Sequence, residues 1–113
     1  MQDQLENMLN QLQLHNQQLQ TILLQKQTLM LQGKEIEKAL EEIEKVSDDI
    51  YKSIGPILVK TGKTEIKKEL EESKEEAELK IKTLETQEKR LKAKIRESQE
   101  KFQSLIPKSA EGG

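Results

Sequence analysis

A four-residue segment, Thr61-Gly62-Lys63-Thr64, resembles the end of a phosphate-binding loop and stands just before a predicted helix. Such a loop needs a further glycine, separated by four residues from its Gly-Lys-Ser/Thr end, because its backbone N–H groups must wrap around a phosphate. Here the preceding glycine is Gly55, and six residues separate it from Gly62. We therefore interpret the segment as a solvated turn followed by a helix whose N-cap is Thr64, and we predict that it binds no nucleotide.

Residue types that commonly carry out catalysis are scarce in this chain. There is no cysteine, which excludes disulfides, thiol catalysis and thiolate metal sites, and there is a single histidine, His15. The glutamates are interleaved with lysines, often four residues apart, which is typical of solvated helix faces rather than of carboxylate pairs for acid–base chemistry. We predict no catalytic residue, no metal and no cofactor, and hence no enzyme.

A basic run lies between Lys89 and Arg96 and raises the possibility of nucleic-acid binding. Glutamates flank the run, no aromatic residue interleaves with it, and the whole chain has a net charge of -2. We therefore predict no nucleic-acid partner. No apolar run approaches the roughly 20 residues that span a bilayer, and residues 1–10 do not have the pattern of a secretion signal. These features predict a cytoplasmic protein that does not associate with membranes.

The composition argues against a compact domain built by this chain alone. Of its 113 residues, 33% are hydrophobic and 35% charged, and Tyr51 and Phe102 are the only aromatic side chains. A typical globular domain is nearer half apolar and a quarter charged. The apolar residues are nevertheless periodic, so we expect ordered structure that gains its burial from long helices and from partner subunits.

Two long segments have the three-four apolar stepping of a coiled-coil seam. The first, residues 5–46, contains no proline, and we interpret its Gly33 as a bend or a point of close approach. The second, residues 64–106, ends before Pro107, and residues 107–113 are predicted to be a disordered tail. The predicted seam of the first segment consists of Leu5, Met8, Leu12, His15, Leu19, Ile22, Lys26, Leu29, Gly33, Ile36, Leu40, Ile43 and Ser47. That of the second consists of Leu70, Lys74, Ala77, Ile81, Leu84, Glu88, Leu91, Ile95, Ser98, Phe102 and Leu105.

A different pattern separates the helices. Two strand-like runs flank the turn signal Gly55-Pro56 and predict a β-hairpin over residues 50–61. Its apolar residues point to both faces, and a lone hairpin is marginally stable in water, so we expect it to pair with the hairpins of other subunits. The residues that we assign to assembly are Ile50, Tyr51, Ile54, Ile57, Leu58 and Val59.

The lengths of the elements predict the architecture. The two helical segments span roughly 63 and 65 Å at the rise of an α-helix, so they should fold back on each other as an antiparallel coiled coil. The fold class is therefore mainly α, with two long helices joined by one hairpin that assembles into an oligomeric β-barrel hub. Residues 1–113 form one domain in this interpretation.

The order of these elements and the residues within them resemble those of the β subunits of prefoldin, most closely the archaeal type. The resemblance is carried by the hairpin residues 48–61, by the glutamine-rich stretch of residues 17–27, and by residues 84–91 of the second helix. It implies a hexamer of two α and four β subunits, in which the hairpins form the hub and the coiled coils project from it. It further implies an ATP-independent holdase that binds non-native proteins at the distal tips and delivers them to a group II chaperonin.

Apolar residues near the two chain ends are the candidate client-binding surface. Residues 1–33 carry only three charged side chains, Asp3, Glu6 and Lys26, so apolar groups there would meet other proteins with little charge nearby. The predicted client-binding residues are Leu5, Met8, Leu9, Leu12, Leu14, Phe102, Leu105 and Ile106. Further apolar residues, Leu23, Leu24, Met30 and Leu31, extend the excess along the first helix. An alternative function is that of a structural coiled-coil spacer or adaptor that binds one defined partner. The hairpin argues against it, because a plain spacer would need only a short polar loop to join its two helices.

Overall fold

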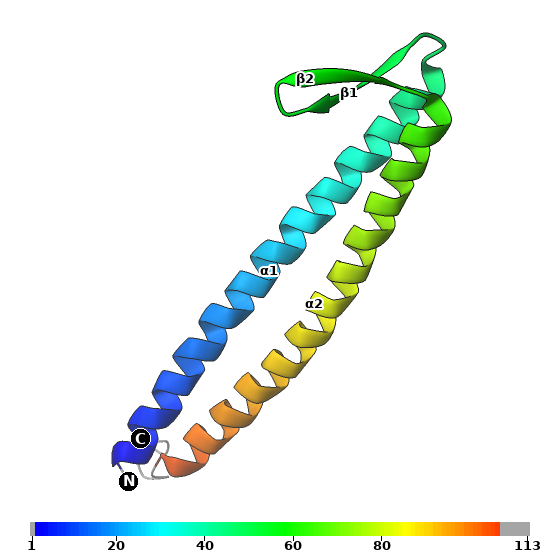
Figure 1. The fold of residues 1–113 in the computed structure, drawn as a ribbon. Helices are drawn as coiled ribbons and strands as arrows, with labels where there is room; N and C mark the ends of the chain where they lie inside the picture. The colour runs from blue at the N-terminus through cyan, green and yellow to red at the C-terminus, as the bar shows by residue number, and fades with distance from the viewer. Residues whose placement is uncertain (1, 107–113) are drawn as a thin grey trace. The chain divides into compact units, whose positions relative to one another are not determined.

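The structure is a computed structural model and describes residues 2–106. Its elements follow the order α1 (Gln2–Lys45), β1 (Ile50–Ile54), β2 (Ile57–Thr61) and α2 (Lys63–Leu105), as Figure 1 shows. Two long helices with one antiparallel hairpin between them confirm the predicted fold class, apart from its assembly. The predicted disordered tail lies outside the described residues.

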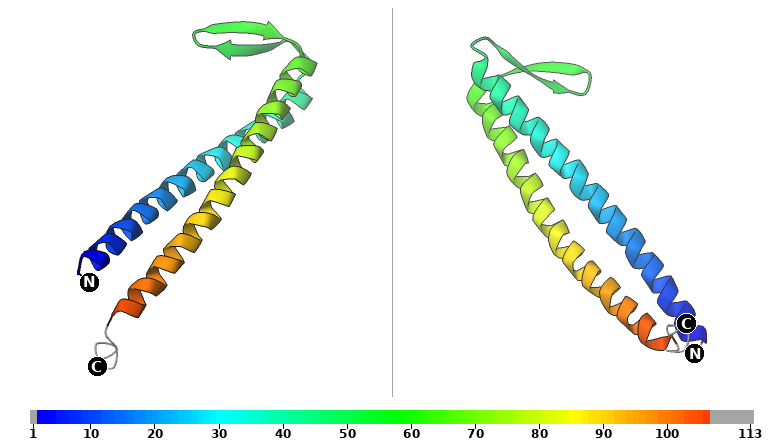
Figure 2. Two further views of the ribbon diagram at one scale, coloured as in Figure 1. Left: turned by 60° about the horizontal axis from the view of Figure 1, so that its bottom comes forward. Right: turned by 180° about the vertical axis from the view of Figure 1, so that it is seen from behind.

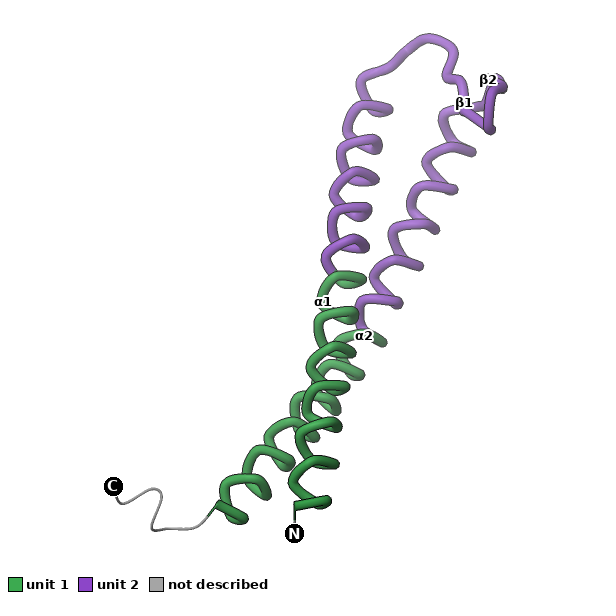
Figure 3. Tube along the Cα trace, turned by 90° about the vertical axis from the view of Figure 1, so that its left-hand side faces the viewer, with its two compact units in different colours: residues 1–26, 83–113 green, residues 27–82 purple. Residues whose placement is uncertain are grey.

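The helices belong to two compact units, which are coloured separately in Figure 3. The terminal unit comprises residues 1–26 and 83–113, and the hairpin unit comprises residues 27–82. In the terminal unit the first part of α1 and the last part of α2 run antiparallel. In the hairpin unit the remaining parts of both helices do the same and lead into the hairpin (Figure 2).

Burial in the terminal unit follows the predicted seam. On α1, the half-buried residues of this unit are Leu5, Met8, Leu12, His15, Leu19, Ile22 and Lys26, all of which are predicted seam positions. On α2, Leu91 and Ile95 are buried, and Leu84, Glu88, Ser98 and Phe102 are half-buried. Leu105, the last predicted seam position, is instead exposed, because α2 ends there.

The hairpin unit has a second short core on the same seam. Ile36 of α1 and Ala77 of α2 are its buried residues, and Leu29, Leu40, Ile43, Leu70 and Ile81 are half-buried. Within the described chain, Gly33 is not a point of close approach. Helix α1 is continuous through this residue, and a Cβ added there would meet no atom within 4 Å, so no neighbour requires a glycine.

The hairpin turn requires its glycine. Gly55 has a φ of 58°, a conformation that residues with a Cβ rarely adopt, and Ile54 pairs with Ile57 across the turn. Pro56 fixes its own φ near −65°, so the two turn residues have the signs of a type II′ turn, whose twist suits a two-residue hairpin. The sequence Gly55-Pro56 thus determines where β1 ends and β2 begins.

Helix α2 starts differently from the prediction. The N–H of Ile66 donates to the carbonyl oxygen of Gly62 at 3.0 Å, which makes Gly62 the N-cap and places Thr64 inside the first turn. The prediction of Thr64 as N-cap was therefore wrong. Glycine is an acceptable N-cap, and the residue after it, Lys63, has a partner that sequence patterns do not reveal.

Candidate functional site

The two faces of the hairpin both carry exposed apolar side chains. Residues that pair across the strands share a face, so Ile54, Ile57 and Val59 lie on one face and Tyr51 and Leu58 on the other. All five are exposed, and Leu58 is the most exposed of them at 69%. Ile50, the sixth residue predicted to act in assembly, is half-buried. Within the described chain, the hairpin thus leaves most of its apolar side chains uncovered.

One ion pair links the hairpin to α2, and a second lies within the hairpin segment. The ammonium group of Lys52 on β1 lies 2.7 Å from a carboxylate oxygen of Glu69 on α2. Across the hairpin, the Nζ atom of Lys60 lies 3.4 Å from an oxygen of Asp49, which precedes β1. Both pairs are solvent-exposed and contribute little stability, and Lys52–Glu69 is the one that connects the hairpin to a helix of its unit.

Lys63 closes the end of α1. Its ammonium group donates to the carbonyl oxygens of Glu44 at 3.2 Å and of Val46 at 3.4 Å. The last carbonyls of a helix lack intrahelical partners and carry a partial negative charge, so a cation there is favourable. The Lys67 ammonium bonds the carboxylate of the same Glu44 and holds the pKa of that group below its ordinary value. Lys63 is therefore a helix-capping residue, and its interpretation as a solvated turn residue was wrong.

In the terminal unit, the predicted client-binding residues divide into two classes. Leu9, Leu14 and Leu105 are exposed, at 50%, 52% and 38%. The other predicted client-binding residues are half-buried: Leu5, Met8, Leu12, Phe102 and Ile106. A shallow depression near the chain ends contains Met8 and Leu105 together with the amide side chains of Gln4, Asn7 and Gln11. Lys101 and Ser104 line it from α2, so this end of the unit combines apolar groups with amide groups and one lysine.

A larger groove of about 580 Å³ runs between α1 and α2 in the same unit. Leu14 and Ile22 contribute apolar surface from α1, and Leu91 contributes it from α2. Arg90 and Lys94 supply positive charge from α2, and several glutamines supply amide groups. None of the residues that line the groove is acidic.

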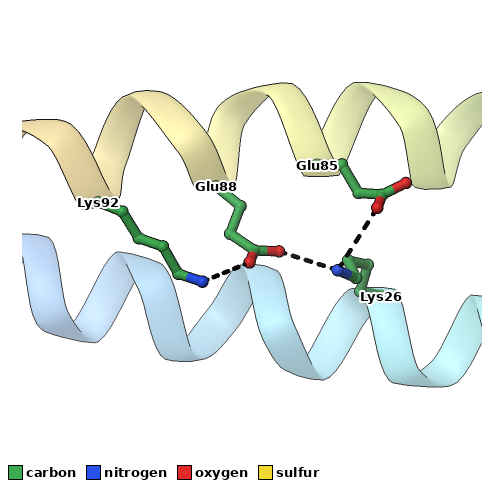
Figure 4. Close-up of polar contacts among 4 residues, drawn as sticks. All are labelled: Lys26, Glu85, Glu88 and Lys92. Atoms are coloured by element: carbon green, nitrogen blue, oxygen red, sulfur yellow. Dashed lines mark hydrogen bonds and ion pairs between the residues drawn. The ribbon is translucent and has the colours of Figure 1, made fainter.

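A polar network interrupts the apolar seam of the terminal unit, and Figure 4 shows its four residues. The Nζ atom of Lys26 on α1 lies 2.9 Å from Oε1 of Glu88 and 3.9 Å from Oε2 of Glu85, both on α2. Lys92 approaches the other oxygen of Glu88 at 2.8 Å. Little of the Lys26 and Glu88 side chains remains exposed, 21% and 14%, so each provides the charge that the other needs on leaving water.

The network shifts two pKa values in opposite directions. Hydrogen bonds from Lys92 and then from Lys26 hold the pKa of Glu88 below its ordinary value, against a smaller opposing effect of burial. The hydrogen bond to Glu88 raises the pKa of Lys26 above its ordinary value. Both groups are therefore charged at neutral pH. The predicted break of the seam at Lys26 is in fact a paired position.

His15 also lies on the seam of the terminal unit, where it is half-buried. Its Nδ1 atom is inaccessible to solvent and has no hydrogen-bond partner among the described residues. An unpaired buried polar atom costs stability, so Nδ1 contributes no favourable hydrogen bond to the seam. In residues 2–106, no group of histidine, cysteine, aspartate and glutamate side chains could hold a metal ion.

The network, the capping role of Lys63 and the groove were all missed by reasoning from the sequence. The seam stepping did place Lys26 and Glu88 on the inner faces of their helices, and an opposite-charge pair at two such breaks is a signal that could have been used. The groove gave no such signal, because its residues come from two segments more than 60 positions apart.

Comparison with protein families settles the relationship that the fold suggests. Residues 6–109 match the profile described as a prefoldin subunit. The chain belongs to the prefoldin subunit family. No curated protein sequence matches it. Two solved structures of prefoldin subunits resemble it over most of their length.

The first of these structures is the prefoldin beta subunit from Thermococcus strain KS-1. It is 40% identical in sequence, with a TM-score of 0.82, and the match covers 92% of this chain and 95% of that one. The second is the prefoldin beta2 subunit from the same strain, at 27% identity and a TM-score of 0.69, with 76% and 94% covered. The resemblance inferred from the hairpin and the helices is thus confirmed. Among the described residues, no helix has the length and hydropathy needed to cross a membrane.

Proposed function

We propose that this prefoldin subunit is part of an ATP-independent chaperone that holds non-native proteins. The supporting observation is the terminal unit, where Leu9 and Leu14 are exposed on a part of α1 that carries few charges and Leu105 is exposed at the end of α2. Apolar surface of this kind attracts the apolar segments that unfolded chains expose. Membership of the prefoldin family makes the same function the first to test.

The hairpin supports assembly as the second part of the proposal. If the hairpins of several subunits joined into a common β-barrel, their free strand edges would be paired and the exposed apolar side chains of one face would be enclosed. We propose a hexamer of two α and four β prefoldin subunits, of which this chain, as one domain spanning residues 1–113, is a β subunit. The similarity to two prefoldin beta subunits supports that assignment. Such a hexamer would act in the cytoplasm and pass its clients to a group II chaperonin.

Several arms acting together would give the complex its strength. A contact with a single exposed leucine contributes on the order of 1–2 kcal/mol when a client covers it. An unfolded chain that engages several subunits at once binds far more tightly than it binds any one of them, because the second contact is intramolecular. Contact with one subunit and engagement of several subunits both proceed without nucleotide hydrolysis. This agrees with the spacing of Gly55 and Gly62, which does not fit a phosphate-binding loop.

The test is suppression of aggregation. The chain, assembled with a candidate α subunit, is added without nucleotide to an unrelated protein that is unfolding, and light scattering of that protein is followed. We expect scattering to fall at near-stoichiometric amounts of the complex and to be indifferent to added ATP. Aggregation that proceeds unchanged at an excess of assembled complex would refute the holdase function and favour an adaptor that binds one defined partner.

A further inference from the structure

The groove between α1 and α2 in the terminal unit has an unbalanced charge. Arg90 and Lys94 lie four positions apart on α2, which places them on one face of the helix. Neither forms an ion pair with another described residue, although the flanking Lys92 and Lys101 do. Like charges at this spacing repel each other, so an anion between them would be stabilised.

The opposite side of the groove cannot neutralise these cations. Its α1 residues are Leu14, Ile22 and the uncharged polar residues Gln17, Gln18 and Thr21, and residues 7–25 of the chain contain no acidic side chain at all. The groove thus presents positive charge on α2, apolar groups on α1 and at Leu91, and no competing carboxylate. Its charge is complementary to an anionic ligand that also carries apolar groups.

The dimensions favour an extended peptide. Arg90 and Lys94 are separated by about 6 Å along α2, and every second side chain of an extended chain is separated by about 6.6 Å. Two acidic residues at positions i and i+2 of such a peptide would therefore both reach a cation. The residue between them would point to the other side, where Leu14 and Ile22 lie.

The glutamines suit the backbone of the same ligand. An extended peptide that does not pair with a strand has both N–H and C=O groups to satisfy. A glutamine amide donates and accepts hydrogen bonds, and Gln17, Gln18 and Gln87 line the groove from both helices. A volume of about 580 Å³ lies within the range of about 300–1,000 Å³ that is usual for ligand pockets.

The geometry points to a peptide-binding groove that selects extended segments of alternating acidic and apolar residues. This inference rests on the proposed holding function and narrows it, since it names the kind of client segment that the side of the arm takes. It differs from binding at the chain ends, where the exposed groups are apolar or amide and Lys101 is already paired with Glu97. Clients rich in such segments would be held at two places on one subunit.

The experiment compares three short fluorescein-labelled peptides in which leucine alternates with aspartate, asparagine or lysine. Their binding to the full chain in its native assembly is measured by fluorescence anisotropy at low ionic strength. We expect the aspartate peptide to bind more tightly than the asparagine peptide, on the order of fivefold, because two exposed charge contacts are gained. The preference should shrink as salt is added, and the lysine peptide should bind most weakly.

Two double variants locate the effect. Arg90→Gln/Lys94→Gln should abolish the preference for aspartate, so that the aspartate and asparagine peptides bind this variant equally. Lys89→Gln/Arg96→Gln removes the same charge from the same helix at positions outside the groove, and it should keep the preference. Leu14→Ser, at an exposed position, should weaken the binding of the aspartate and asparagine peptides alike.

Equal binding of the aspartate and asparagine peptides would overturn the inference, as would an equal loss of preference in both double variants. A single-stranded oligonucleotide that binds more tightly than the aspartate peptide, through Arg90 and Lys94, would assign the groove to nucleic acid instead. Suppression of aggregation without any peptide preference would support the holding function and reject the groove as a peptide-binding site. Peptide selectivity without suppression of aggregation would support the groove as a peptide-binding site and reject the general holding function.

Discussion

Lys26 and Glu88 face each other within the seam of the terminal unit, with Nζ and Oε1 2.9 Å apart. Their neighbours on the seam are mainly apolar, so the pair marks one position along the helices where the two must meet. Sliding α1 against α2 by one heptad would separate Lys26 from Glu88 and leave Glu88 with Lys92 alone, which is costly for half-buried charges. A polar pair at a seam position is a known means of fixing the register of two helices.

Replacing one member of this pair should destabilise the helix pair more than replacing both. Lys26→Met leaves the half-buried Glu88 with Lys92 as its one remaining partner, and Glu88→Leu leaves the half-buried Lys26 with only the more distant Glu85. The double variant instead completes an apolar seam. We expect both single variants to lower the midpoint of thermal unfolding, followed by circular dichroism, and the double variant to recover most of the loss. Lys80→Met, which breaks the exposed pair with Glu76, should leave the midpoint nearly unchanged. A double variant as unstable as the worse single one would contradict this account.

The same pair predicts how stability depends on pH. The folded-state pKa of Glu88 is lowered, so its contribution is complete above its unfolded pKa of about 4.3 and is lost as the pH falls through the lower folded value. The pKa of Lys26 is raised, so its contribution is complete below about 10.4 and is lost as the pH rises through the higher folded value. Glu88→Gln should weaken both dependences in unfolding midpoints measured from acid to alkaline pH. Curves for this variant that parallel the native protein's in both windows would argue against the network.

Lys63→Ala should lower stability, because the carbonyls of Glu44 and Val46 lose the cation that caps α1. A charge at a helix C-terminus contributes about 0.3–1 kcal/mol, and we expect a loss of that order in urea unfolding of the assembled protein. Lys68→Ala removes an exposed lysine from the same turn region of α2 and serves as the control. Equal stability of the two variants would return Lys63 to the role of a solvated turn residue. ATP should bind to neither the native protein nor the variant.

Two glycines should respond to alanine in opposite ways. Gly33→Ala should stabilise the hairpin unit by about 1 kcal/mol, because glycine is a poor helix former and the new methyl group meets no neighbour. Gly55→Ala should destabilise it by about 1–2 kcal/mol, because its φ of 58° is unfavourable for a residue with a Cβ. Denaturant unfolding of the two variants measures both effects. Destabilisation by Gly33→Ala would show that the position serves a contact with another subunit.

The sequence predicted the seam because burial on long helices depends on a local repeat. Nearly every position of the three-four stepping, from Leu5 to Phe102, is half-buried or buried in the structure. The hairpin was equally readable, since Gly55-Pro56 permits few backbone conformations. Both features are determined by residues that are close together in the sequence, so no contact with a distant segment is needed to predict them.

What the sequence did not predict depends on contacts between distant segments. Lys63 looks like a turn residue because its partners, the last carbonyls of α1, have no side-chain signature. The division of the client-binding residues into exposed Leu9 and half-buried Met8 follows from the exact facing of the two helices. Fine positioning of this kind is set by packing rather than by composition.

The hairpin should decide assembly. Ile57 and Val59 share one face of the hairpin and are exposed in the isolated subunit, so Ile57→Asp/Val59→Asp changes little within the chain itself. If that face is covered in the oligomer, the variant would bury unpaired charges at a cost of several kcal/mol. We expect light scattering to show loss of the oligomer while the helical circular dichroism signal largely survives. Ile57→Val/Val59→Ile, which keeps both side chains β-branched and apolar, should assemble normally, and an intact oligomer from the aspartate variant would exclude this face from the hub.

The exposed apolar residues near the chain ends should decide client holding. Leu9→Ser/Leu105→Ser removes two side chains that are exposed in the terminal unit, so the half-buried seam residues Met8 and Phe102 stay in place and the helices should remain folded. Each leucine contributes on the order of 1–2 kcal/mol when a client covers it, and the loss multiplies over the subunits that share one client. Assembly should therefore survive, and suppression of aggregation should fall sharply.

The control for that variant is Leu79→Ser, which removes an equally apolar and 65% exposed side chain from α2 in the hairpin unit. It should suppress aggregation as well as the native complex does, because Leu79 lies outside the terminal unit. The comparison thus separates a loss of apolar surface near the chain ends from a general loss of exposed apolar surface. Adding Phe102→Ser and Ile106→Ser to the first variant should deepen its defect, although unfolding midpoints must be measured alongside because both side chains are half-buried. If Leu9→Ser/Leu105→Ser held clients as well as Leu79→Ser, the chain ends would be helix termini only, and the contact with clients would move to Leu23 and Leu24, which are also exposed in the terminal unit.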